Sequence, residues 1–115
     1  MIKIIKNPIK KQEIMEIAKN QFGDLVKMVA DTEKKILAVG GDFHSEEELL
    51  LMEQENSKRQ NLWGINFYPA KPKSEQTEFD SVINLKPAFG NRSRGVENQT
   101  EQEKIKKIVE ELILD

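Results

Sequence analysis

The sequence predicts a single α+β domain spanning residues 1–115, and three observations lead to this class. The length is close to the commonest domain size, and such a chain can bury about two-thirds of its unfolded surface. Apolar residues recur at helical spacing in three segments and follow strand patterns in five others. The segments run β-α-β-β-α-β-β-α, so we expect a mainly antiparallel sheet with helices packed on it.

The first half of the chain is expected to contain a strand, a helix and a hairpin. Residues 2–5 form the short first strand. An Asn-Pro pair then predicts a helix start, since Asn caps the first amides and Pro fits the first helical position. Gly23 is typical of the helix end. Residues 25–30 and 36–39 form a hairpin whose second strand is wholly apolar, which predicts a place inside the sheet.

The second half is expected to contain two helices around a second hairpin. Ser45 and Glu48 form a capping box that opens a short helix. Residues 62–68 and 79–86 alternate as strands and pair across a long proline-containing loop. Thr100 opens the third helix. Its amphipathic stripe consists of Ile105, Ile108, Val109, Leu112 and Ile113.

Composition limits the classes of function. The chain has no cysteine, which excludes disulfides, thiolate metal ligands and a cysteine nucleophile. No apolar run approaches the ~20 residues that span a bilayer, and no signal peptide is recognisable, so we expect a cytoplasmic protein without a membrane partner. The 18 Lys and Arg nearly balance the 20 Asp and Glu, and a net charge of −2 disfavours a general nucleic-acid binder.

The first candidate site is the arginine corner, which we define as residues 90–95 (Gly-Asn-Arg-Ser-Arg-Gly). Arg92 and Arg94 carry forks of donors that match phosphate or carboxylate oxygens. The flanking glycines let the backbone approach a ligand, while Asn91 and Ser93 add neutral polar contacts. The composition therefore predicts an anion-binding loop.

An alternative interpretation of the arginine corner is structural. Either Arg92 or Arg94 pairs with a carboxylate such as Asp80 or Glu97 and so holds the loop in place. The segment matches no phosphate-loop or dinucleotide fingerprint, so its spacing does not decide between the two interpretations.

The second candidate site is the histidine corner, residues 42–45, which follows an apolar strand and opens a helix. His44 is the single histidine and would act as general base or acid, with Asp42 orienting it. The alternative is a histidine that only flanks the helix start. A metal site drawn from Asp42, His44 and one of residues 46–48 lacks the spacing of a known motif, and we assign no metal ligand. A magnesium site that shares a phosphate ligand stays open as an alternative.

Polar side chains in the second hairpin supply further candidates. Asn66 and Asn84 are placed opposite the main aromatic set of their strands, where they would line a polar pocket together with Tyr68. Trp63 and Phe67 are better explained as core residues than as bases for stacking nucleotides.

Three segments, residues 40–44, 62–69 and 90–97, carry a resemblance to a known family. They are similar to a small prokaryotic family of about this length that is classed only as a domain of unknown function. The resemblance covers nearly the whole chain and implies a bacterial or archaeal cytoplasmic protein. It implies no activity, substrate or catalytic residue.

The leading functional hypothesis is binding of a small anionic ligand, namely a phosphate ester, a nucleotide or a carboxylate, at the arginine corner. In an enzymatic version, Arg92 and Arg94 would stabilise developing charge while His44 moved a proton. The alternatives are a protein interaction module or homo-oligomer without catalysis, and an RNA-binding or RNA-cleaving protein. The residues identify no cofactor.

Overall fold

A five-stranded sheet forms the centre of the computed structural model, which describes residues 1–115. Every neighbouring pair of strands is antiparallel, which confirms the predicted fold class. The strands lie in the spatial order β1 (Lys3–Ile5), β4 (Ile36–Val39), β3 (Val26–Asp31), β5 (Leu62–Phe67) and β6 (Thr77–Glu78).

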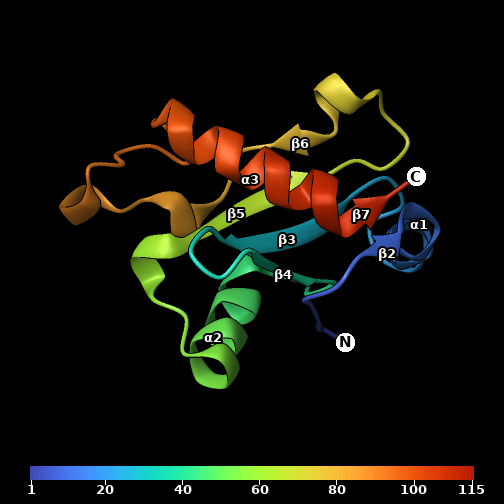
Figure 1. The fold of residues 1–115 in the computed structure, drawn as a ribbon, viewed down its shortest axis with the longest axis horizontal. Helices are drawn as coiled ribbons and strands as arrows, with labels where there is room; N and C mark the ends of the chain where they lie inside the picture. Colours follow the sequence, from blue (N-terminus) through green and yellow to red (C-terminus); the bar gives the residue numbers. More distant parts are fainter.

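Helices cover both faces of this sheet (Figure 1). The larger apolar core lies between the sheet and two helices, α1 (Lys11–Asn20) and α3 (Gln99–Leu112). The smaller core lies on the opposite face under α2 (His44–Glu55). Strand β4 is buried along its whole length, as its apolar sequence predicted, because it pairs with β1 and β3 and is covered on both faces. None of the helices has both the length and the apolar composition needed to cross a bilayer.

A second, two-stranded sheet was not predicted. Strand β2 (Ile9–Lys10) pairs in parallel with β7 (Ile113–Leu114), which follows α3 directly. The first helix therefore begins at Lys11 and not at the Asn-Pro pair, because the residues after that pair extend to join β7. This pairing places the C-terminal end of the chain beside α1 (Figure 1).

The residues predicted to cap α2 and α3 are wrong. At α2 the Glu46 carboxylate accepts the N–H of Phe43 at 3.2 Å. Phe43 is therefore the N-cap, and the helix begins at His44, one residue before Ser45. At α3 the N-cap is Asn98, whose side chain accepts an amide N–H at 3.1 Å in place of Thr100.

The strand predicted for residues 79–86 is also wrong. This segment forms a 3-10 turn, η3 (Val82–Asn84), and irregular backbone on either side of it. Strand β5 pairs with β6 over only two residue pairs. Beyond this pairing, the Asn84 side chain bonds to the backbone of β5 at Gly64. The amide accepts the N–H of Gly64 at 2.8 Å and donates to the Gly64 carbonyl at 3.0 Å. One asparagine side chain thus replaces one peptide unit of the missing strand.

A second buried asparagine holds the rest of this segment. The Asn91 amide donates to the carbonyls of Asn84 at 2.7 Å and Gly95 at 2.8 Å, and it accepts the N–H of Glu97 at 2.9 Å. Asn84 also donates to the carbonyl of Arg94 at 2.9 Å. We call these two residues the asparagine pair, and together they fix residues 81–97 against the edge of β5.

We expect Asn84→Ala to destabilise the fold by at least about 2 kcal/mol, because it leaves the buried N–H and carbonyl of Gly64 without side-chain partners. Urea denaturation measures this loss. Asn84→Asp, which keeps nearly the same size but removes both donors, should also lose stability, whereas exposed Asn7→Ala should not. Equal stability of Asn84→Ala and Asn7→Ala would contradict this role for the side-chain amide.

Candidate functional site

The arginine corner lies on an exposed loop between η4 (Pro87–Phe89) and α3. Arg94 Nε is 2.7 Å from Asp80 Oδ1, and the two side chains are 54% and 48% exposed. The ion pair named by the structural interpretation is therefore present. The guanidinium of Arg92 forms no ion pair, although its backbone N–H donates to the Glu97 carboxylate at 2.9 Å. Only one of the two arginines thus has a guanidinium without a carboxylate partner.

The neutral residues of the arginine corner serve the loop itself. The Asn91 amide faces inward, where its hydrogen bonds go to backbone groups of the same segment. The Ser93 hydroxyl accepts the N–H of Gly95 at 3.2 Å. These contacts set the shape of the corner and direct the arginine side chains outward.

His44 is the first residue of α2 and is 7% exposed. Its Nε2 lies 2.7 Å from the Ile65 carbonyl, so Nε2 carries a proton and donates it. Burial lowers the pKa of His44 to about 4, and the charges of Lys27 and Arg94 act in the same direction. The imidazole is therefore neutral at pH 7.

Asp42 does not orient His44, because its carboxylate accepts a hydrogen bond from Gln21 at 3.3 Å while Ile65 positions the ring. No group of three His, Asp or Glu side chains is arranged to hold a metal ion.

The two corners lie beside the same part of β5. A Cβ on Gly64 would come within 2.6 Å of the Ser81 side chain and within 3.0 Å of His44 Cγ, so both side chains pack over this glycine. Asp80 and Arg94 are near enough to influence the charge of His44. Gly64 is therefore the position where the missing side chain makes room for His44 of the histidine corner and for Ser81.

Asn66 and Tyr68 lie further along the same face. The Asn66 amide donates to the Glu78 carboxylate at 2.8 Å, and the Tyr68 hydroxyl donates to the same oxygen at 3.3 Å. Lys27 Nζ contacts the Asn66 oxygen at 3.5 Å. Burial, followed by the negative charge of Glu78, raises the pKa of Tyr68. The polar groups of these side chains therefore bond to one another, and Lys27 contacts an amide oxygen without forming an ion pair.

A different cleft, which the sequence did not reveal, lies beside the C-terminal half of α3. It encloses about 190 Å³ and we call it the lysine cleft. Lys11 begins α1, Lys73 begins the 3-10 turn η2 (Lys73–Glu75), and Lys106 lies on α3. The remaining lining consists of apolar Phe67, Val109 and Ile113, neutral polar Ser74, Gln76 and Thr77, and acidic Glu110 and Asp115.

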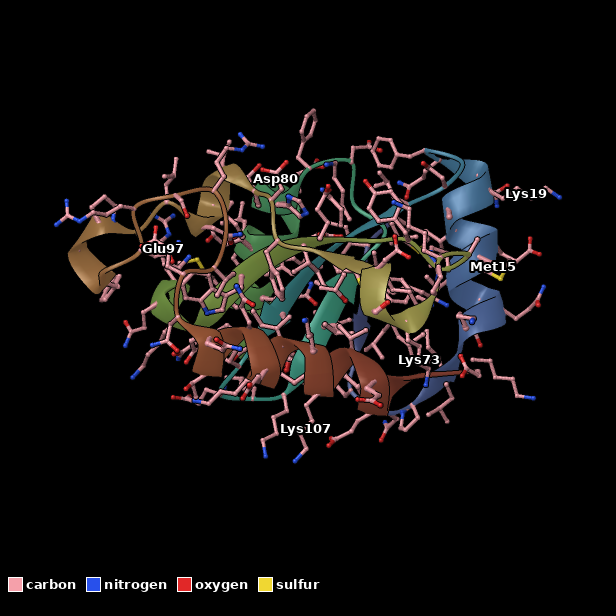
Figure 2. All side chains as sticks on the ribbon, turned by 90° about the horizontal axis from the view of Figure 1, so that it is seen from above. Met15, Lys19, Lys73, Asp80, Glu97 and Lys107 are labelled. Carbon is pink, nitrogen blue, oxygen red and sulfur yellow. The ribbon has the colours of Figure 1, made fainter.

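Basic side chains outnumber acidic ones in the lysine cleft, with three lysines against two side-chain carboxylates. Asp115 pairs with Lys11 at 3.2 Å and with Lys73 at 3.4 Å. Lys106 forms no ion pair, and its ammonium lies 5.8 Å from the centre of the Phe79 ring. Figure 2 shows Lys73 beside the end of α3 and Asp80 on a separate part of the molecule, so the cleft and the arginine corner are distinct sites.

Fold and sites together define a small α+β protein with an antiparallel sheet and a lysine-lined cleft. On one face of the sheet, polar side chains bond to one another. The chain belongs to the family described as "Protein of unknown function (DUF5674)", whose model matches residues 3–112. This match confirms the resemblance to a domain of unknown function. Comparison with curated proteins found no match, and neither did comparison with solved structures.

The titration of His44 tests the geometry of its corner, and the absence of any other histidine makes its NMR signal unambiguous. We expect its ring protons to titrate with a midpoint near pH 4, because burial disfavours the charged form. The unfolded chain takes up this proton near pH 6.5. The lowered pKa of His44 therefore contributes about 3 kcal/mol at most to the stability of the fold above pH 6.5. This contribution is lost as the pH falls from 6.5 toward 4. A midpoint near 6.5 in the folded protein would contradict the buried, carbonyl-bound ring.

Proposed function

We propose that the protein binds a small anionic ligand, either a phosphate ester or a carboxylate, and that the lysine cleft is the principal site. The observation that carries this proposal is the convergence of three lysines from three separate elements on one cleft in which basic side chains outnumber acidic ones. A lysine ammonium binds phosphate or carboxylate as a point charge, and cleft walls of low dielectric constant strengthen that attraction.

The size and lining of the cleft narrow the class of ligand. Sites for drug-sized molecules usually enclose about 300 Å³ or more, so a volume of about 190 Å³ favours a small anionic group with a short body. Phe67, Val109 and Ile113 offer apolar contacts to that body, while the lysines bind the charged end. A nucleotide would place its phosphate in the cleft and leave the base outside.

The arginine corner is the second location for the same function. Arg92 presents an exposed guanidinium without an ion pair, and the exposed Arg94–Asp80 pair is worth about 1 kcal/mol or less, so an anion competes with it. Catalysis is not part of the proposal, because the Nε2 proton of neutral His44 is already donated to Ile65. The histidine would need to turn away from this carbonyl before Nε2 acted on a substrate.

We expect Lys73→Gln/Lys106→Gln to weaken binding of inorganic phosphate and butyrate at least about tenfold, because each lost charged hydrogen bond is worth about 1.5 kcal/mol or more. Isothermal titration calorimetry at constant ionic strength measures the affinity. Lys34→Gln/Lys58→Gln makes the same charge change at two exposed lysines outside the cleft and should bind as the wild type does.

The third arm of this experiment is Arg92→Ala/Arg94→Ala. Affinity lost only in this variant would move the site to the arginine corner, which is the location that the sequence predicts. No binding by the wild-type protein, or equal binding by all variants, would overturn the proposal. Thermal unfolding of each variant without ligand shows whether a lost affinity reflects a lost fold.

A second candidate function is self-association, and the exposed apolar side chains of one loop favour it. Val82, Leu85 and Phe89 all lie in the segment that spans η3 and η4, and each is more than 40% exposed. Apolar side chains grouped on a surface mark association sites in many proteins. If this function holds, the wild-type chain sediments as a dimer at high micromolar concentration and Phe89→Ser sediments as a monomer. A wild-type monomer would contradict it.

A further inference from the structure

The Asp115 side chain lies between two lysines of the lysine cleft. Its Oδ1 is 3.2 Å from Lys11 Nζ and its Oδ2 is 3.4 Å from Lys73 Nζ, so each carboxylate oxygen has its own ammonium partner. Neither lysine is in an ion pair with any other acid. The carboxylate therefore occupies the place where an external anion would meet both charges.

Backbone pairing brings Asp115 to this place. Strand β7 lies in parallel register with β2, with Leu114 opposite Lys10, so the residue after Leu114 comes beside Lys11. Ile113 is buried at the base of this pairing and also lines the cleft. The position of Asp115 thus follows from the small two-stranded sheet and not from its own side chain alone.

We infer that the Asp115 carboxylate is an internal competitor, which occupies the lysine cleft in the free protein and is displaced by the external anionic ligand. This inference rests on the proposed function of the cleft. The hydrogen bond and the charge of Lys11, followed by those of Lys73, lower the pKa of Asp115, so the competing group stays ionised at neutral pH. Its side chain is 62% exposed, and ion pairs this exposed are weak enough for a ligand to replace.

The remaining acid of the cleft provides a matched control. Glu110 lines the same cleft on α3, yet it forms no ion pair with any lysine. Asp115→Asn and Glu110→Gln therefore remove the same charge from the same cleft, but only the first removes a group bound to the lysines. A general electrostatic effect would act on both variants alike.

Isothermal titration calorimetry with inorganic phosphate and with butyrate, on the full chain at constant ionic strength, separates the outcomes. If Asp115 occupies the lysines nine-tenths of the time, Asp115→Asn tightens binding about tenfold, while Glu110→Gln changes it less than about twofold. Addition of phosphate to the wild-type protein should also shift the NMR signal of the Asp115 carboxyl carbon.

Each alternative outcome bears on one of the two proposals. Equal tightening in Asp115→Asn and Glu110→Gln would overturn the internal competitor and leave the anion site in place. An unchanged affinity in Asp115→Asn, with binding still lost in Lys73→Gln/Lys106→Gln, would do the same. Absence of binding by both the wild type and Asp115→Asn would instead overturn the site itself.

Discussion

The hydrogen bonding of the β5 edge at Gly64 is the constraint on which the polar half of the molecule depends. A buried peptide group needs partners for both its N–H and its carbonyl, and a side-chain amide supplies them here in place of a sixth strand. Because a single residue, Asn84, bonds both groups of Gly64, the residues around it need not be extended and the chain can turn. That freedom brings Asp80, Ser81 and Arg94 to the same part of β5 as His44. A regular strand at this edge would have held residues 79–86 extended and prevented that arrangement.

The same constraint explains which parts of the fold the sequence predicted. Strands β3, β4 and β5 are largely apolar runs buried within the sheet, and α3 buries its apolar residues at helical spacing, so pattern and structure agree. Residues 79–86 also alternate, but their bonds to Gly64 of β5 come from the Asn84 side chain, and their backbone bonds are local or go to residues 91–94. The pattern of polarity carries no information about that choice. Strands β2 and β7 have two residues each, which is too short for any period. Their pairing is a consequence of where α3 ends.

The distance between the basic residues along the chain distinguishes the two candidate sites. The arginine corner was recognisable because its cations are adjacent in sequence, and the paired alternative was recognisable because Asp80 lies nearby. The lysine cleft was not recognisable, since Lys11, Lys73 and Lys106 come from three segments that only the fold brings together. At the arginine corner Arg94 is paired with Asp80, while the guanidinium of Arg92 has no ion pair. In the cleft one lysine stays unpaired, and the other two share a single exposed acid.

The state of His44 bears on whether the proposed anion site could also transfer a proton. A general base works best when its pKa is near the working pH, and a ring whose pKa is about 4 is a weak base at pH 7. Its Nε2 proton joins the start of α2 to the Ile65 carbonyl, so protonation or rotation of the ring would disturb the contact between helix and sheet. Histidines that move protons are exposed to substrate, whereas this one is enclosed between α2 and β5. The geometry of His44 therefore fits a structural role better than proton transfer, and the groups that our proposal assigns to a ligand are the lysines of the cleft and Arg92.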